Sequence, residues 1–387
     1  MNQSDAIIIS SESFRGHHYG HNHPLSIPRV ALTIDLITSY RVPAPHEYCE
    51  ARKASFEELT WFHTSTYVNA LQECQDSGRV SSGMRRQFNL GNFENPFFDN
   101  MFTIPALAAG GSIQGAELVL SGSMAFNPAG GMHHAVPGKA RGFCYFNDAV
   151  LGIIRLRKAG WRILYFDLDA HHGDGVQQAF EDDPDVLTVS FHMDTAYAYP
   201  RRNGNLSDIG SCGTAVNLPL PKSVNDSEYR LAFQTLWPKL LKRFNPDAVV
   251  LQTGTDILYN DPLGKFNISN RLFLEVVAQV KKTAPRHPNG VPRLLVLGGG
   301  GYHPISLARC WTGVWNILAD WNMPASLPDQ GRFMLQNLLW KDEEDHDPQT
   351  LFNLLDSRYD DPMDGPVRDE ISLNVNCLLH THPFFSR

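Results

Sequence analysis

Carboxylates and imidazoles are densely packed in the segment DLDAHHGDG, residues 167–175. Asp167, Asp169 and His171 are spaced by two residues, and in an extended segment this spacing places their side chains on one face. A carboxylate beside an imidazole is a ligand pair that suits Zn²⁺ or Fe²⁺. A helix cap and packed core histidines would explain an isolated Asp-x-His pair, but this density of polar groups favours a metal site.

A third metal ligand must come from elsewhere in the chain, and Asp256 is the best candidate. It follows an apolar run, Ala248–Gln252, and a turn that contains glycine. Structural zinc sites usually close with four Cys or His ligands, whereas catalytic sites keep a coordination position open for water or substrate. A set made of Asp169, His171 and Asp256 therefore predicts a catalytic metal site.

Two adjacent histidines, His133 and His134, follow a Gly-Gly pair. Glycine lets the backbone approach a ligand closely, so the two imidazoles are candidates for the general base and general acid of a hydrolysis. Asp167 and Asp174 are carboxylates that could orient them. Two histidines packed in the core are the competing interpretation, which the His-His pair alone does not exclude.

A run of glycines, Gly298–Gly301, precedes Tyr302. The glycines allow tight backbone turns, and the tyrosine hydroxyl could donate a hydrogen bond to a developing oxyanion. A glycine run after a strand could instead bind phosphate. However, the chain has neither the G-x-G-x-x-G pattern nor a P-loop at this position, so oxyanion stabilisation is favoured.

Strand and helix patterns alternate along the chain, and they must position these clusters. The predicted strands are Ala6–Ser10, Arg162–Leu168, Val186–Phe191, Ala248–Gln252 and Arg293–Leu297, and the predicted helices are Arg29–Tyr40, Asn147–Lys158, Glu228–Arg243, Arg271–Lys282 and Ile305–Asp320. This alternation predicts an α/β fold with an open, mostly parallel sheet and helices on both faces. Because the polar clusters follow the strands, we expect the active site at the carboxyl ends of the strands.

Composition and charge exclude several classes of protein. With 42% hydrophobic and 19% charged residues among 387, the chain is not globally disordered. The net charge of −8 argues against a nucleic acid or an anionic membrane as partner. We find no apolar run long enough to span a membrane and no signal-peptide pattern. The six cysteines are scattered, which is typical of reduced thiols in a cytoplasmic protein.

Together, the motifs resemble the histone deacetylase superfamily of metal-dependent amidohydrolases. The matching segments are GGMHHA, RGFCYFND, LYFDLDAHHGDGVQQAF, LTVSFH, TGTDILYNDPLG and LGGGGYH, and they occur in the family's order. The resemblance covers roughly residues 15–320 and implies the arginase/deacetylase fold. GHNHPLSIPRV and RRQFNLGNFENPFFDNMF are similar to class I enzymes and to the bacterial acetoin-utilisation (AcuC-like) branch, and the lack of a targeting signal favours the bacterial type.

The resemblance implies hydrolysis of the acetyl amide of N6-acetyl-lysine in proteins, and it gives each clustered side chain a role. His134 would be the general base, and His133 would remain protonated as its electrostatic partner. Asp167 would orient His133, and Asp174 would orient His134. Tyr302 would polarise the scissile carbonyl together with Zn²⁺, or Fe²⁺, on the three predicted ligands.

The resemblance also implies an acyl-lysine channel, an acetate-release channel and a structural K⁺ or Na⁺ site. The channel residues are Gly142, Phe143, Tyr199, Leu263 and Glu94; the acetate-release residue is Arg29; and the monovalent-cation residues are Asp167, Asp169, His171, Ser190 and Phe191. Two aromatic walls suit the apolar stem of lysine, which needs no hydrogen bonds.

The chain departs from the family's pattern near the substrate. Tyr199 stands where phenylalanine is usual, and Met132 stands where leucine or tryptophan is commoner. The loop at residues 91–96 is one residue longer than in class I enzymes. Their aspartate that grips the substrate backbone has only Glu94 as an approximate match.

Three alternative functions remain open at this point. An acetylpolyamine amidohydrolase would use the same scaffold; Leu263 stands where one polyamine-selective branch carries glutamate, but Glu94 could serve a polyamine. A ureohydrolase of the arginase type would need a further Asp-x-Asp, and Asp256 is followed by Ile257 and Leu258. A non-catalytic acyl-lysine binding protein would be expected to lack Tyr302, a metal ligand or the His pair, and none is missing.

We expect one deacetylase domain over residues 1–387, with residues 321–387 forming a helical or irregular extension packed on it. The expected partner is a cytoplasmic acetylated protein, with acetyl-CoA synthetase as a candidate by family analogy, and the oligomeric state is not predicted. The His-rich stretch Gly16–Pro24 is interpreted as a loop beside the release channel rather than a second metal site. The acidic segment Lys341–Glu370 is interpreted as a solvated surface excursion.

Overall fold

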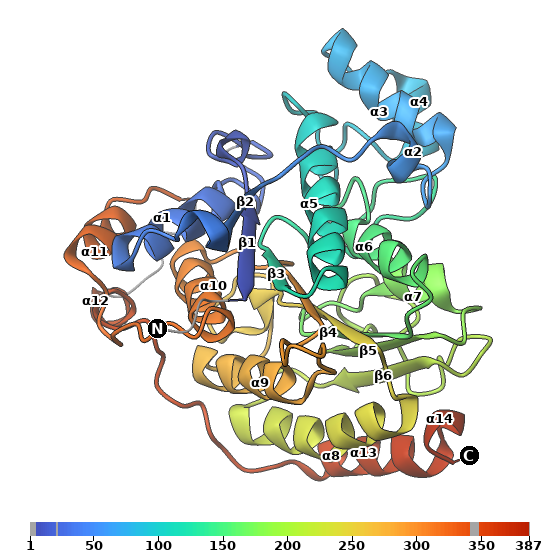
Figure 1. Ribbon diagram of the computed structural model, residues 1–387, viewed down its shortest axis with the longest axis vertical. Helices are drawn as coiled ribbons and strands as arrows, with labels where there is room; N and C mark the ends of the chain where they lie inside the picture. The colour runs from blue at the N-terminus through green and yellow to red at the C-terminus, as the bar shows by residue number, and fades with distance from the viewer. Residues whose placement is uncertain (1–4, 21, 341–347, 387) are drawn as a thin grey trace.

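The structure is a computed structural model that describes residues 5–20, 22–340 and 348–386 (Figure 1). Its centre is an eight-stranded sheet with the order β2-β1-β3-β8-β7-β4-β5-β6. The strands are β1 (Ala6–Ser10), β2 (Tyr48–Glu50), β3 (Met124–Asn127), β4 (Ile163–Asp167), β5 (Val186–Met193), β6 (Ala215–Leu220), β7 (Ala248–Gln252) and β8 (Leu294–Leu297). Every neighbouring pair is parallel, so the sheet is wholly rather than mostly parallel.

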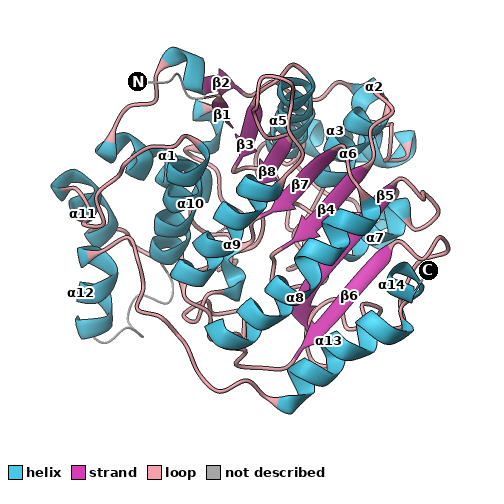
Figure 2. Cartoon of the chain, turned by 60° about the horizontal axis from the view of Figure 1, so that its bottom comes forward, coloured by secondary structure: helices cyan, strands magenta, loops and turns pink. Residues whose placement is uncertain are grey.

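Helices cover both faces of this sheet, which confirms the predicted α/β class (Figure 2). The helices are α1 (Arg29–Tyr40), α2 (Phe56–Leu59), α3 (Ser65–Ser77), α4 (Ser82–Phe88), α5 (Thr103–Leu120), α6 (Asp148–Arg157), α7 (Asp174–Phe180), α8 (Asp226–Phe244), α9 (Asn270–Thr283), α10 (Pro304–Leu318), α11 (Asp329–Gln336), α12 (Pro348–Asp356), α13 (Asp369–Thr381) and α14 (Pro383–Ser386). Among the described residues, no helix is both long and apolar enough to cross a membrane.

Alternate residues of each central strand pack into different cores, because successive side chains of a strand point to opposite faces. In β4, Ile163 and Tyr165 join the core under α5, α6 and α7. Leu164 and Phe166 join the core under α8, α9 and α10. Since both faces are buried, the strand reads as a continuous apolar run, which is why the sequence identified it.

The metal-ligand motifs lie at the place where the strand order of the sheet reverses. From β4 the chain proceeds through β5 and β6 to one edge, whereas β7 and β8 lie on the other side of β4. Parallel αβ sheets bind ligands at the carboxyl ends of the strands that flank such a switch point. Asp167 ends β4 and Gln252 ends β7, and these two residues are paired in register. The segments that follow them carry the predicted ligands.

Several elements escaped the sequence patterns for physical reasons. β6 contains Pro219 and lies at an edge of the sheet, where a strand tolerates proline. α5 is buried on nearly all sides and rich in alanine and glycine, so it shows no amphipathic period. β3 has only four residues.

The chain beyond α10 returns to pack on the domain. α13 lies against α8 and β6, at the bottom of Figure 1. Residues Lys341–Asp347 of the acidic segment lie outside the described residues. The interpretation of the rest of this segment as a solvated excursion is wrong in part, because Arg358 and Asp360 are buried.

Asp360 is held by a buried network. One of its carboxylate oxygens lies 2.8 Å from the guanidinium of Arg309, which is itself buried. The other oxygen accepts a hydrogen bond from the backbone N–H of Asn270. Removing one partner of such an ion pair leaves an uncompensated buried charge, which makes the pair sensitive to mutation.

Asp360→Ala is therefore expected to lower the free energy of unfolding by about 3 kcal/mol. Urea denaturation followed by circular dichroism measures this change. Glu275→Ala, which removes a largely exposed partner of Arg230, is the control and is expected to cost less than about 1 kcal/mol. Equal costs for the two variants would show that the C-terminal segment is not anchored by this network.

Candidate metal centre and active site

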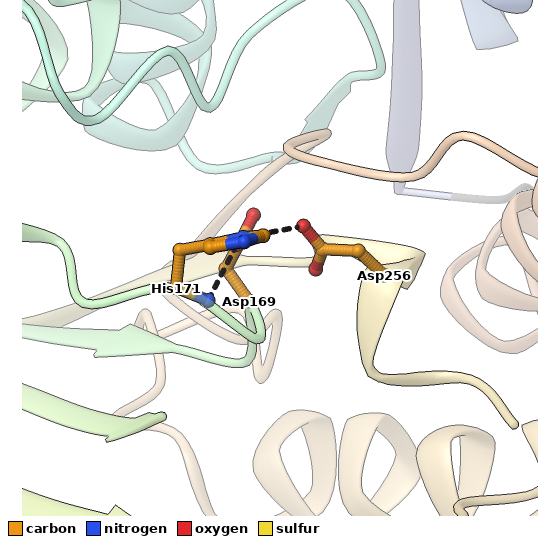
Figure 3. Close-up of side chains that lie close together, drawn as sticks. All are labelled: Asp169, His171 and Asp256. Atoms are coloured by element: carbon orange, nitrogen blue, oxygen red, sulfur yellow. Dashed lines mark hydrogen bonds and ion pairs between the residues drawn. The ribbon is translucent and has the colours of Figure 1, made fainter. Parts of the chain in front are cut away.

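The structure brings together Asp169, His171 and Asp256, as the sequence predicts. Asp169 and His171 lie in the loop after β4, and Asp256 lies in the short helix η3 (Thr255–Ile257) after β7. Their ligand atoms all lie within 4.8 Å of one another. The Nδ1 atom of His171 is 3.2 Å from Oδ1 of Asp169 and 3.0 Å from Oδ2 of Asp256. Figure 3 shows the three side chains pointing toward one another.

The chemistry of this donor set fits a divalent metal ion. All three side chains are buried or nearly so, and two of them are carboxylates. Burial and the negative charge of Asp169 raise the pKa of Asp256 to about 7. A divalent cation between the carboxylates would remove this repulsion, and one imidazole with two carboxylates suits Zn²⁺ or Fe²⁺. Among the described residues, no other group of His, Cys, Asp and Glu has this geometry.

Surrounding polar groups orient the two carboxylates. Oδ2 of Asp169 accepts hydrogen bonds from Nε2 of Gln252 and from the backbone N–H of Gly300, both at 2.8 Å. Oδ1 of Asp256 accepts a hydrogen bond from the backbone N–H of Ala170 at 2.9 Å. These bonds hold one oxygen of each carboxylate. The other oxygen, Oδ1 of Asp169 and Oδ2 of Asp256, lies near Nδ1 of His171.

Two glycines are required by the close approach of these carboxylates. A Cβ atom at Gly254 would overlap the carboxylate of Asp169, and a Cβ atom at Gly300 would overlap that of Asp256. The sequence pattern linked the run Gly298–Gly301 to tight turns. The structure shows that at Gly300 the requirement is space beside a metal ligand.

The two histidines each pair with the expected carboxylate. Nδ1 of His133 is 2.9 Å from Asp167, and Nδ1 of His134 is 2.9 Å from Asp174. The two Nε2 atoms are 3.0 Å apart, a distance that places one hydrogen between them. Each ring is thus oriented by its own carboxylate and faces the other ring.

The charges around the pair place its single proton on His133. Burial lowers the pKa of His133, but the carboxylates of Asp167 and Asp169 outweigh this and raise it to about 9. Burial and the positive charge of His133 lower the pKa of His134 to about 3. These shifts favour the shared hydrogen on Nε2 of His133, which then donates it to Nε2 of His134.

Sequence reasoning missed several residues that hold the histidines. Asp148 accepts hydrogen bonds from the backbone N–H groups of Gly131 and Met132. Asn147 caps α6 and donates to the carbonyl oxygens of His133 and Ala135. The Asn-Asp pair at a predicted helix start was the available signal, but capping residues are common and their loop partners are not encoded locally.

A pocket of about 320 Å³ leads from the surface to this centre. It contains all five predicted channel residues together with His134, His171 and Tyr302; the predicted ones are Gly142, Phe143, Tyr199, Leu263 and Glu94. The rings of Phe143 and Tyr302 lie 6.0 Å apart in an edge-on arrangement. The backbone N–H of Tyr302 donates to Asp261 at 2.7 Å, which fixes the residue after the glycine run.

Glu94 is hydrogen-bonded to two other residues of the pocket wall and to Asn89. Its carboxylate accepts hydrogen bonds from the backbone N–H of Gly142 at 2.6 Å, from the hydroxyl of Tyr199 at 3.0 Å and from the side chain of Asn89 at 3.1 Å. The tyrosine at position 199 and the glutamate at position 94, two departures from the family's pattern, therefore contact each other directly.

Arg29 lies behind the metal centre, beside a separate cavity of about 70 Å³. Its guanidinium donates to the carbonyl oxygens of Gly299 and Gly301 at 2.9 and 3.0 Å. His17 and Tyr19 from the His-rich stretch also line this cavity. Part of the stretch thus lies beside Arg29, the residue predicted for the release channel, and His21 lies outside the described residues.

The remaining predicted residues, Ser190 and Phe191, lie on β5 beside β4. Ser190 is paired in register with Asp167, and its hydroxyl hydrogen-bonds to Nδ1 of His192 at 2.8 Å. The side chain of Phe191 is buried in the core under α8.

Comparisons with known proteins agree with this geometry. The profile of the histone deacetylase domain matches residues 23–318. Human "Histone deacetylase 1" is 38% identical over 318 residues, which are 81% of this chain and 64% of that protein. Arabidopsis thaliana "Histone deacetylase 9" is 38% identical over 81% of this chain and 72% of that protein. The chain thus matches less than two thirds of the human protein's length.

Two solved structures are similar over almost the whole chain. A histone deacetylase homologue in complex with SAHA superposes with a TM-score of 0.90 at 39% identity, covering 96% of this chain and 99% of that one. A homologue from Aquifex aeolicus superposes with a TM-score of 0.89 at 38% identity, with the same coverage. The metal triad, the histidine pair and these matches together show that the chain belongs to the histone deacetylase family.

Proposed function

We propose that this protein hydrolyses the acetyl amide of N6-acetyl-lysine in proteins and releases acetate and free lysine. The observation that carries the proposal is one pocket in which aromatic walls lead to a metal triad, a histidine pair and a tyrosine. Phe143 and Tyr199 supply apolar surface for the four-carbon lysine stem. The amide at the end of the stem would then lie beside His134 and Tyr302.

The side chains of the chain divide the work of hydrolysis. Bound Zn²⁺, or Fe²⁺, would polarise the amide carbonyl and make a water molecule more acidic. Nε2 of His134 accepts the proton of the attacking water in exchange for its hydrogen bond from His133, and it then passes a proton to the departing lysine amine. Protonated His133 and the hydroxyl of Tyr302 favour the negative charge that develops on the carbonyl oxygen. Asp167 and Asp174 keep both rings in position.

We assign product release and a structural cation to the neighbouring residues. Arg29, beside its cavity, would attract the acetate anion away from the metal centre. A K⁺ or Na⁺ ion would be held by Asp167, Asp169, His171, Ser190 and Phe191, partly through backbone oxygens. The adjacency of β4 and β5 at Asp167 and Ser190 supports this assignment.

The branch of the family, the cellular location and the partner are also proposals. We assign the protein to the bacterial acetoin-utilisation branch, in the cytoplasm, with an acetylated protein such as acetyl-CoA synthetase as its partner. The second candidate function is deacetylation of polyamines. The observation behind it is the carboxylate of Glu94 in the pocket wall, which a distal ammonium group could contact in competition with the three donors that already hold it.

One experiment separates the two functions. The Zn²⁺-loaded protein is assayed for acetate release from an acetyl-lysine peptide and from N-acetylputrescine, side by side. We expect kcat/KM to be higher for the peptide. A higher value for N-acetylputrescine would move the function to polyamines, and no acetate from either substrate would refute both.

Tyr302→Phe is expected to reduce kcat by about 10²–10³-fold, because the variant loses one donor to the oxyanion. Zinc content and the affinity for a hydroxamate inhibitor should change much less. Tyr48→Phe, at the far edge of the sheet, is the matched control and should keep full activity. Full activity of Tyr302→Phe would refute the assigned role.

Asp256→Asn is expected to weaken zinc binding by more than about 100-fold. Loss of a residue that only hydrogen-bonds to a metal ligand costs up to about 100-fold, and loss of a ligand should cost more. The substitution keeps the shape of the side chain but removes its negative charge. Elemental analysis after dialysis against a chelator measures the retained metal, and Asp329→Asn on α11 is the control. Unchanged zinc content would mean that Asp256 is not a ligand.

A further inference from the structure

The wall of the acyl-lysine pocket includes two exposed lysines in addition to Glu94. Lys222 follows β6, and Lys265 lies between η3 and α9. Both line the pocket together with Tyr197 and Leu263. The backbone N–H of Ser223 donates to the carbonyl oxygen of Lys265 at 2.6 Å, so the two loops are joined where the lysines emerge.

Neither lysine is neutralised by a carboxylate. The ammonium group of Lys222 lies 4.8 Å from the ring centroid of Tyr197. The ammonium group of Lys265 donates to the carbonyl oxygen of Pro262 at 2.8 Å. In the part of the chain that the structure describes, the ion pairs within 4.0 Å include neither residue. Both residues are exposed, so their ammonium groups are accessible to an incoming substrate.

Glu94 does not offer an equivalent free negative charge. Three donors already hold its carboxylate: the N–H of Gly142, the hydroxyl of Tyr199 and the side chain of Asn89. A substrate ammonium group would have to compete with these bonds. The part of the mouth open to new partners is therefore positive.

We propose that Lys222 and Lys265 determine specificity, favouring acetyl-lysine with neighbouring Asp or Glu residues and disfavouring acetylated polyamines. The inference rests on the proposed deacetylase function and names its substrate class. When the lysine stem is in the pocket, flanking residues of the peptide lie over the mouth, within reach of the two ammonium groups. The distal ammonium of a polyamine would meet the same groups and be repelled.

The effect should be moderate and sensitive to salt. The lysines are at an exposed rim, where each charge pair contributes little and acts largely on the rate of association. We expect kcat/KM to be about fivefold higher for a peptide with acidic flanks than for one with basic flanks. The ratio should fall toward one at high ionic strength, because exposed charges are screened.

The test uses three substrates with the Zn²⁺-loaded protein: acetyl-lysine peptides flanked by Asp, by Lys or by Ala. The double variant Lys222→Glu/Lys265→Glu reverses both charges at the mouth. The control, Lys239→Glu/Lys242→Glu on α8, makes the same change in net charge away from the pocket. Circular dichroism and zinc content verify that each variant is folded and loaded.

The inference requires that the wild type and the control prefer the acidic peptide and that the mouth variant prefers the basic one. Equal rates on all three peptides in the wild type would overturn the inference but leave the proposed function intact. A mouth variant that keeps the wild-type preference would overturn it as well. A protein that releases acetate from none of the peptides would refute the proposed function, and the inference with it.

Discussion

Two buried carboxylates that face the same point are the constraint on which this structure depends. Asp169 and Asp256 repel each other in a place that water hardly reaches, and the raised pKa of Asp256 reflects this. The fold compensates with backbone N–H groups from Ala170 and Gly300 and with the amide of Gln252. These donors must come from three strand ends, which requires a parallel sheet with its carboxyl ends together. A divalent cation bound by the two carboxylates would complete the compensation.

The sequence predicted the centre of the fold better than its edges. The central strands are long apolar runs because both faces are buried, and the polar motifs that end them stand out. α1 and β7 have the predicted bounds. Edge strands such as β6 and the wholly buried α5 lack a diagnostic period, so local patterns could not identify them. The buried ion pair of Arg309 and Asp360 could not be predicted either, because charged residues are usually exposed.

In the candidate site, too, some residues could be predicted from the sequence and others could not. Its metal ligands and histidines are encoded in short motifs, and the structure places them together. Their supporting residues are not, because Gln252, Asp148 and Asn147 act through contacts with groups that are distant in sequence. At the mouth, Glu94 contacts Tyr199 across 105 residues. The sequence showed Glu94 and Tyr199 as two separate departures from the family's pattern, whereas the structure shows that they are hydrogen-bonded to each other.

The reversal of strand order beside β4 has a consequence for how the protein reaches its native state. His171 and Asp256 are 85 residues apart, and strands β5 and β6 lie between them in the sequence. Asp256 therefore lies beside Asp169 and His171 when β7 is paired with β4. A metal ion that binds all three ligands selects the fully assembled sheet over partly folded forms. Bound metal would thereby favour completion of the sheet, so metal supply would bear on the yield of native protein as well as on chemistry.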